Sequence, residues 1–465
     1  MSNSSIRERK DVPASEKWDL STLFKTDEDW EKALAQIVPA AEELAKCKGT
    51  LALSCADLLA ALRDSEKLWK NAELVGQYAG LQHTADEGDS SATDREGRFS
   101  MAYSKAAALL SFFDTEIMEI PDSKINSWIK LPDFADYKVY LQKLLHMKPY
   151  ILSEKEEKLL ALQGETAQTA EKTFSVLSNV DLNFGNINVN GKDMPLTQTT
   201  WSSFMDNGDR RIREKAYKQF YNTFENNQHT LANLYAGSVN QDVFEMRARG
   251  YTSSLEKALY KDKVPLSVYR NLIETVHKNF PVLHRCYELR KKVLKLDELR
   301  HYDVYVPLVK NVTVNTPYEQ SVEICRQALS PLGKEYTDTL CNGLLHGWAD
   351  RYENKGKRSG AFSSGAYTGY PYILLNYKDS VIRDVFTMAH EGGHSMHSWY
   401  SAHNNPFMQY SYTIFEAEVA STFNEELVFE YLLKNANLSA CNARKRYSCH
   451  AAPPDNVCRI RNENP

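Results

Sequence analysis

The chain has little of what marks membrane proteins, disulfide scaffolds and loop-rich proteins. No apolar run approaches the roughly 20 residues needed to cross a bilayer. Glycine numbers only 20 and proline 16 in 465 residues, which favours long regular elements joined by few loops. The eight cysteines form no C-x-x-C pair and are too sparse for a disulfide framework, so we expect free thiols.

Neither sign of charge dominates. The 56 basic and 61 acidic residues give a net charge of −5. A chain this balanced has no electrostatic reason to bind nucleic acid or anionic lipid, so we expect neither as a partner. The N-terminal residues are polar and lack the apolar core of a secretory signal. These observations predict a cytoplasmic protein of unknown oligomeric state.

The first 180 or so residues have the apolar periodicity of helices. Thr26-x-x-Asp29 is typical of a helix cap and precedes Trp30, Leu34 and Ile37 on one helical face. No repeat of 20–50 residues is present, which argues against a solenoid. Further helices are predicted at 52–80, 96–119, 153–178, 208–248 and 266–295.

Three stretches are typical of strands or extended structure instead. The apolar residues before Asn190-Gly191 predict a hairpin at that turn and a domain boundary near it. Residues 302–308 look extended. The stretch 360–377 is also strand-like. Its core at 370–377 is rich in aromatic and branched residues, and Pro371 predicts that it is an edge strand.

The sharpest motif is His390-Glu391-Gly392-Gly393-His394, which follows a helical apolar pattern. On a helix, positions 390 and 394 lie about 40° apart, so both imidazoles could bind one zinc ion. Glu391 lies about 100° away from His390, close to the metal but not on it, where a carboxylate can deprotonate a zinc-bound water. The alternative is a surface helix that happens to carry two histidines and a glutamate.

A third ligand must come from another segment. Glu418 and Glu425 are two turns apart on one face of a second predicted helix. Glu418 on the zinc and Glu425 behind it would give one ligand and one supporting carboxylate. The alternative is that both belong to a solvated helix face.

Three neighbouring residues are open to two interpretations each. Gly392 and Gly393 lie inside the predicted helix, where each costs about 1 kcal/mol relative to alanine. They either allow a neighbouring element to approach closely or mark a kink. His397 lies about 300° round from His394, and we favour a polar cleft or surface histidine over a fourth ligand.

The order and spacing of these motifs resemble the zinc oligopeptidases of the oligoendopeptidase F group, relatives of thimet oligopeptidase. The resemblance rests on HEGGHSMHSWYS at 390–401 and YTIFEAEVASTFNEEL at 412–427. It extends over roughly residues 15–435 and includes Trp18-Asp19-Leu20-Ser21, Tyr302 to Pro307, Gly356 to Ser363 and Pro371 to Leu374.

The resemblance implies roles for five residues. His390, His394 and Glu418 match the ligands of one zinc ion, Glu391 matches the general base, and Glu425 matches a carboxylate that supports the zinc histidines. The implied activity is a metalloendopeptidase that hydrolyses short oligopeptides with a zinc-activated water. Two histidines and a glutamate also accept cobalt or manganese. The family lays its extended peptide against the edge strand, a mode of binding that reads little sequence.

The implied fold is mainly α, with two helical lobes enclosing a deep cleft and a small sheet or edge strand beside the zinc-binding helix. We therefore expect an N-terminal helical lobe at 1–185 and a catalytic domain at 186–440.

The last residues depart from the family. Relatives continue with helices that supply a histidine and tyrosines to the oxyanion, whereas 441–465 match nothing in the family. We expect a C-terminally truncated chain with an aberrant or unstructured tail at 441–465. A zinc knuckle from Cys441, Cys449, His450 and Cys458 is the less favoured alternative, since the spacing fits no standard finger. Two rival functions stay open, a zinc-binding but weak or inactive form and a helical interaction protein.

Overall fold

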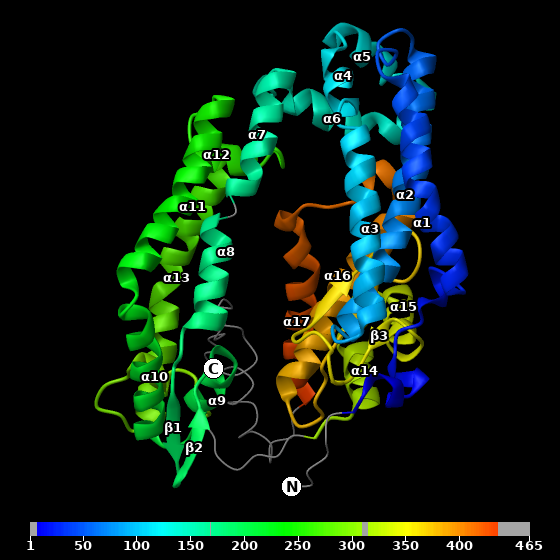
Figure 1. The fold of residues 1–465 in the computed structure, drawn as a ribbon. Coiled ribbons are helices and arrows are strands. Elements are labelled where there is room, and N and C mark those ends of the chain that lie inside the picture. Colours follow the sequence, from blue (N-terminus) through cyan, green and yellow to red (C-terminus); the bar gives the residue numbers. More distant parts are fainter. Residues whose placement is uncertain (1–6, 168, 309–314, 436–465) are drawn as a thin grey trace, which may run out of the picture. The chain divides into compact units, whose positions relative to one another are not determined.

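The computed structural model describes residues 7–167, 169–308 and 315–435, which are mainly helical (Figure 1). Contacts divide the chain into two compact units. Unit 1 comprises the described residues of Met1–His146 and Thr313–Asn437, and unit 2 those of Met147–Val312. The mainly helical fold with small sheets is confirmed. The cleft and the ranges 1–185, 186–440 and 441–465 stay predictions, and the last range lies outside the described residues.

Unit 1 contains the helices that precede residue 148 and those that follow residue 317. The first set is α1 (Asp27–Leu44), α2 (Cys55–Ala85), α3 (Ser90–Leu109), α4 (Phe113–Glu119), α5 (Asp122–Trp128) and α6 (Lys138–Met147). The second set is α14 (Tyr318–Ala328), α15 (Lys334–Leu345), α16 (Ile382–Asn404) and α17 (Ile414–Asn435). Its strands are β3 (Ala349–Asp350), β4 (Phe362–Ser364) and β5 (Tyr372–Leu374).

The described residues of unit 2 all lie between 147 and 308. Its helices are α7 (Glu154–Ala167), α8 (Thr169–Val176), α9 (Gln198–Met205), α10 (Arg210–Glu225), α11 (Gln228–Arg249), α12 (Ser254–Tyr260) and α13 (Leu266–Val293). The antiparallel pair β1 (Asn186–Val189) and β2 (Lys192–Pro195) forms the predicted hairpin. Asn190 and Gly191 both have positive φ, as the two central residues of a type I′ hairpin turn require.

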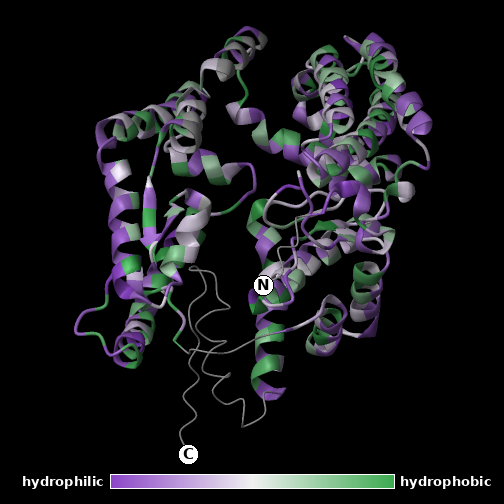
Figure 2. Ribbon diagram, turned by 60° about the horizontal axis from the view of Figure 1, so that its bottom comes forward, coloured by the Kyte–Doolittle hydropathy of each residue, from purple (hydrophilic) through white to green (hydrophobic). Residues whose placement is uncertain are grey.

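Local signals explain where the first long helix begins. The Thr26 hydroxyl accepts a hydrogen bond from the Asp29 amide at 3.2 Å, so the predicted cap of α1 is confirmed. Trp30, Leu34 and Ile37 are buried on one face of α1. Figure 2 shows the same alternation of hydrophobic and hydrophilic residues along the other helices.

The core of unit 1 joins the two stretches of chain that build it. Trp18 and Trp30 share one buried cluster with Tyr372 and Leu374, which come from β5. The Tyr372 ring stands edge-on to Trp18 with centroids 6.1 Å apart. The N-terminal helices and the strand beside α16 are therefore parts of one hydrophobic core.

The small sheet has the order β3-β5-β4. β5 pairs in parallel with β3 and antiparallel with β4, so it is the central strand and the predicted edge position of 370–377 is wrong. Pro371 is compatible with this because it precedes the first residue of β5 and removes no ladder hydrogen bond. The edge strand is β4, earlier in the same predicted stretch.

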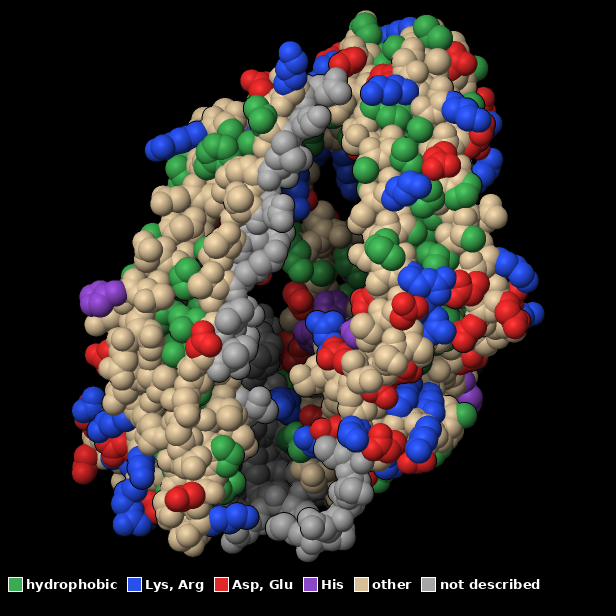
Figure 3. All heavy atoms as spheres, viewed as in Figure 1, with side chains coloured by type: hydrophobic (Ala, Val, Ile, Leu, Met, Phe, Trp, Pro, Cys, Tyr) green, Lys and Arg blue, Asp and Glu red, His purple; other side chains and the backbone are tan. Residues whose placement is uncertain are grey.

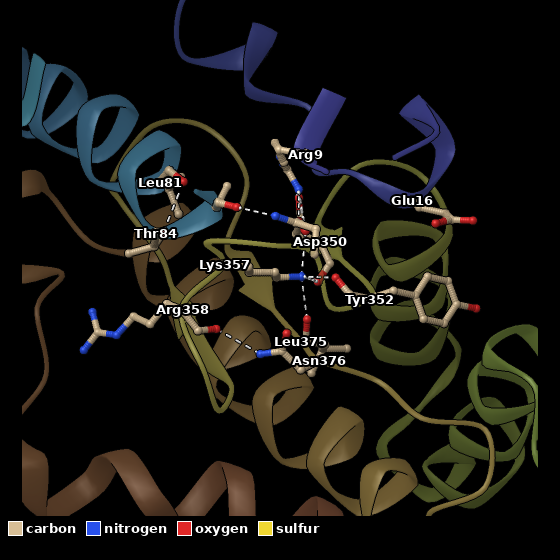
Figure 4. Close-up of polar contacts among 12 residues, drawn as sticks. Arg9, Glu16, Leu81, Thr84, Asp350, Tyr352, Lys357, Arg358, Leu375 and Asn376 are labelled. Carbon is tan, nitrogen blue, oxygen red and sulfur yellow. Dashed lines mark hydrogen bonds and ion pairs between the residues drawn. The ribbon is translucent and has the colours of Figure 1, made fainter. Parts of the chain in front are cut away.

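An ion cluster built around a buried aspartate holds the sheet to the N-terminal segment (Figure 4). The Lys357 ammonium donates to the Asp350 carboxylate at 2.7 Å and to the carbonyls of Tyr352 and Leu375. Arg9 donates to both carboxylate oxygens of Asp350, at 2.9 and 2.5 Å. The side chains of Asp350 and Lys357 have no exposed surface.

Unit 2 has its own buried cluster of aromatic and aliphatic side chains. The predicted extended piece at 302–308 is wrong, because a 3-10 helix forms at His301–Asp303 and bends follow it up to residue 308. Asp303 is buried, and Arg210 and Arg213 of α10 donate hydrogen bonds to its carboxylate at 2.9 and 2.8 Å. These contacts favour the turn over an extended strand.

None of the described helices is both long and apolar enough to span a lipid bilayer. The described cysteines Cys47, Cys55, Cys286, Cys325 and Cys341 are free thiols, as predicted. Cys441, Cys449 and Cys458 lie outside the described residues. Figure 3 shows side chains of both charge signs interspersed on the face in view.

Candidate metal centre

Helix α16 carries both predicted histidine ligands. Its buried face includes Val385, Phe386 and Ala389, and this packing fixes which way the following turn points. His390 and His394 lie on adjacent turns with ring centroids 4.8 Å apart. Their side chains stay 27% and 17% exposed, so both imidazoles can reach a ligand from solvent.

Helix α17 brings Glu418 to the same point. Its Oε2 lies 3.4 Å from His390 Nε2 and 3.5 Å from His394 Nε2. The Ser421 hydroxyl donates to this oxygen at 2.8 Å and so orients the carboxylate. Among the described residues these three form the one group of His, Cys, Asp and Glu whose ligand atoms converge, all within 4.8 Å.

Glu425 lies behind His390. Its Oε1 is 2.6 Å from His390 Nδ1, so a proton on Nδ1 leaves Nε2 free to face Glu418 and His394. Burial lowers the pKa of His390, but the hydrogen bond to Glu425 and the nearby Glu391 and Glu418 outweigh it and raise the pKa overall. Burial and the neighbouring His390 lower the pKa of His394, which favours its neutral form.

Glu391 lies beside the two histidines but does not join the converging group. It is buried, and burial raises its pKa to about 7 although the adjacent His390 lowers it. The backbone of Ser363 in β4 also lowers this pKa. The carboxyl group therefore lies close to both His390 and the edge strand.

The absence of a side chain at Gly393 allows α16 and α17 to approach closely. A Cβ atom there would lie 2.6 Å from the Ala420 carbonyl oxygen and from Ser421 Cα. The backbones of α16 and α17 thus touch at Gly393, and α16 continues unbroken to Asn404, so close approach rather than a kink explains this glycine. Leu340 of α15 lies 3.1 Å from the corresponding point on Gly392.

His397 lies outside the converging group. Its ring stacks on Tyr412 with centroids 3.7 Å apart and an interplanar angle of 11°. It therefore contacts the connection between α16 and α17, as a polar packing residue.

Two residues make contacts around the site that no sequence signal indicates. Asn424 is buried on α17 and donates to the Ala389 carbonyl at 3.0 Å, which ties α17 to α16 beside His390. Ser395 bonds Ser363 across to β4 at 2.8 Å and donates to the Pro371 carbonyl at 3.1 Å. Neither residue type is specific to a metal site, so only the folded arrangement shows their role.

The donor set fits zinc. Tetrahedral ligands about 2.0–2.1 Å from zinc lie roughly 3.3 Å from one another. The two imidazole nitrogens lie 3.4 and 3.5 Å from the Glu418 oxygen, and nitrogen with carboxylate oxygen is a normal zinc donor set. Glu425 on the far nitrogen of His390 is the usual second partner of a metal-binding histidine.

A helical fold with two histidines and a glutamate on crossing helices defines a metallopeptidase type of site. The family model for peptidase family M3 matches residues 203–447, and that for oligopeptidase F matches residues 116–184. The chain belongs to peptidase family M3, in its oligoendopeptidase F group. The predicted class, a metallo-oligopeptidase, is confirmed.

Similar proteins cover nearly all of the chain. An oligoendopeptidase F homologue of Borreliella burgdorferi is 42% identical over 92% of this chain and 72% of its own length. The oligopeptidase PepF of Bacillus subtilis is 38% identical over 92% of this chain, which spans 64% of that protein. A crystal structure of a Chlamydophila abortus protein superposes with a TM-score of 0.82 at 32% identity, covering 96% of this chain and 76% of that one.

Proposed function

We propose that this chain is a zinc-dependent endopeptidase that hydrolyses short oligopeptides. The convergence of His390, His394 and Glu418 within 4.8 Å carries the proposal. A zinc ion held by these residues would act as a Lewis acid, lowering the pKa of a coordinated water and polarising a carbonyl. Family membership supports peptide as the substrate class.

Glu391 acts as the general base. Its carboxylate lies beside the histidines and is buried, so it can take a proton from the attacking water and later deliver it to the leaving amine. Glu425 holds the Nδ1 proton of His390 and so keeps Nε2 available for the metal.

The free edge of β4 places the peptide. The backbone amides of Ile373 and Leu375 donate hydrogen bonds toward β3. The backbone N–H and C=O groups of Tyr372 and Leu374 therefore point toward β4. The partners Ser364 and Phe362 then face β5, and the backbone groups of Ser363 point away from the sheet. No further strand pairs with β4 among the described residues. A peptide added along this edge would run past Ser363, whose backbone lies close to Glu391.

Metal analysis tests the site and a quenched fluorescent peptide tests the activity. We expect about one zinc per chain and its loss in His390→Ala. Glu391→Gln should keep the metal and lower turnover by roughly 10²–10⁴-fold, since it removes only the base. Glu426→Gln, an exposed acid-to-amide change on α17, is the matched control and should leave both unchanged.

Two results would contradict the proposal in different ways. Zinc content that does not change in His390→Ala would reject the metal site and favour a helical interaction protein. Stoichiometric zinc with no turnover above the Glu391→Gln background would leave a zinc-binding protein without peptidase activity.

A further inference from the structure

Helix α2 reaches the edge strand through two polar side chains one turn apart. Gln77 donates to the Ser364 carbonyl at 2.8 Å, and its amide also exchanges hydrogen bonds with the Ser364 hydroxyl, at 3.0 and 3.1 Å. Glu73 accepts a hydrogen bond from the Tyr367 amide at 2.9 Å. Gln77 and Glu73 therefore hydrogen-bond the last residue of β4 and the loop that follows it.

Glu73 also holds a second segment near the site. Its other carboxylate oxygen accepts a hydrogen bond from the Tyr410 hydroxyl. Tyr410 lies in the connection from α16 to α17, four residues before Ile414, where α17 begins. The rings of Tyr367 and Tyr410 pack with centroids 5.2 Å apart. The loop after β4 and the connection between α16 and α17 are therefore in contact, and both hydrogen-bond Glu73.

The residues on either side of Ser364 connect these contacts to α16, the helix that carries Glu391. Ser363 precedes the residue that Gln77 holds. Its hydroxyl hydrogen-bonds the Ser395 hydroxyl of α16 at 2.8 Å, and its backbone lies close enough to Glu391 to lower the pKa of that carboxyl group. Gly365 follows, and its backbone packs so closely on α16 that a Cβ there would lie 2.4 Å from Ser398 Cβ. The edge strand is thus fixed from α2 on one side and from α16 on the other.

We propose that Glu73 and Gln77 are positioning residues that hold β4 and its loop in the conformation that binds peptide substrate. The inference rests on the proposed function and adds residues from a helix that contributes neither a metal ligand nor the base. Neither residue touches His390, His394 or Glu418, so their contribution is to peptide binding and not to metal retention.

Peptide affinity measured without hydrolysis tests this separately from activity. In the Glu391→Gln background, fluorescence anisotropy of a short fluorescein-labelled peptide gives a dissociation constant for zinc-loaded protein. Gln77→Met keeps the volume and removes the hydrogen bonds to Ser364. Each hydrogen bond lost should weaken binding by roughly 2–12-fold. We expect the same rise in KM in the active chain, with kcat within about twofold.

Glu73→Gln is a second variant that preserves shape. It keeps one acceptor and should raise the peptide dissociation constant by a similar factor. Tyr410→Phe removes the other end of that contact. If the two changes act on one interaction, the double variant will raise the peptide dissociation constant by less than the product of the two single factors. Asp64→Asn, an exposed acid-to-amide change on α2, should alter nothing.

Zinc content and the unfolding midpoint complete the test. Weaker peptide binding with unchanged zinc and an unchanged midpoint in Gln77→Met or Glu73→Gln supports the inference. Unchanged peptide affinity in both variants overturns it, as does a loss of zinc that accounts for the weaker binding. If the wild-type chain hydrolyses no peptide, the proposed function fails, whereas the affinity measurement still decides the positioning role.

Discussion

The two units each bury an aspartate between two cations, but they recruit the cations differently. Asp303 in unit 2 is held by Arg210 and Arg213 of one nearby helix, 93 and 90 residues away in sequence. Asp350 in unit 1 is held by Lys357, seven residues away, and by Arg9, 341 residues away. Both aspartate side chains have no exposed surface.

The difference shows what the candidate metal centre depends on. Unit 2 can complete its buried ion cluster from one continuous segment. In unit 1 the second cation, Arg9, comes from the N-terminal segment, and Trp18 from the same segment packs on Tyr372 in the sheet beside α16. The site residues between 390 and 425 are therefore supported by residues near the start of the chain.

Removing the charge of Asp350 should have the largest effect. Asp350→Asn leaves the Lys357 ammonium buried without a counter-charge, which typically costs 3–5 kcal/mol of unfolding free energy. Burial already lowers the pKa of Lys357. We expect unit 1 to unfold at lower urea concentration and to release its metal, as followed by hydrogen–deuterium exchange of unit 1 peptides and by zinc content.

The double variant Asp350→Asn with Lys357→Met separates charge from shape. It removes the uncompensated ammonium and should recover a large part of the lost stability, since apolar replacement of a buried pair is often close to neutral. Equal destabilisation in the single and double variants would mean that hydrogen-bond geometry, and not charge, dominates the cluster.

Removing the charge of Asp303 should have a smaller and more local effect. Arg213 is buried, but Arg210 is 39% exposed and can turn to water, so we expect about 2–3 kcal/mol for Asp303→Asn. Faster exchange should be confined to unit 2 peptides, and zinc content should stay unchanged. Zinc loss in this variant would show that the units are energetically coupled.

Acidification should produce the smallest effect, and in unit 2. Burial raises the pKa of Asp303, but the hydrogen bonds from Arg210 and Arg213 outweigh it and hold the pKa below the ordinary 3.8. A depressed carboxyl pKa gives stability that is complete above the unfolded value and is lost as pH falls through the folded value. Unit 2 exchange should therefore accelerate below about pH 4, and Asp303→Asn should remove this part of the pH dependence.

Features that depend on nearby residues were predictable from the sequence. The cap at Thr26, the hairpin at Asn190-Gly191 and the helical spacing of His390 and His394 each depend on a few neighbouring residues. Glu418 and Glu425 were predicted as a pair on one helical face, and the structure places both against His390. Their roles in binding metal stay predictions.

Features that depend on distant partners were not predictable. The central position of β5 depends on pairing with β3, a two-residue strand without its own sequence signal. Nothing near Asp350 indicates that Arg9 is its partner, and nothing near Ser364 indicates Gln77. The sequence pattern at 302–308 favoured extended structure, but the attraction of Asp303 to two arginines decided the turn.

The discontinuity of unit 1 has a consequence for synthesis on the ribosome. Its first 146 residues emerge before the whole of unit 2, and their partners follow only from residue 313. At about 5–20 residues per second, translation of unit 2 takes roughly 10–30 s. During that interval the side chains that will meet the sheet, Trp18 among them, have no partner strand. The nascent N-terminal helices therefore expose the apolar surface that chaperones recognise until translation has passed β5.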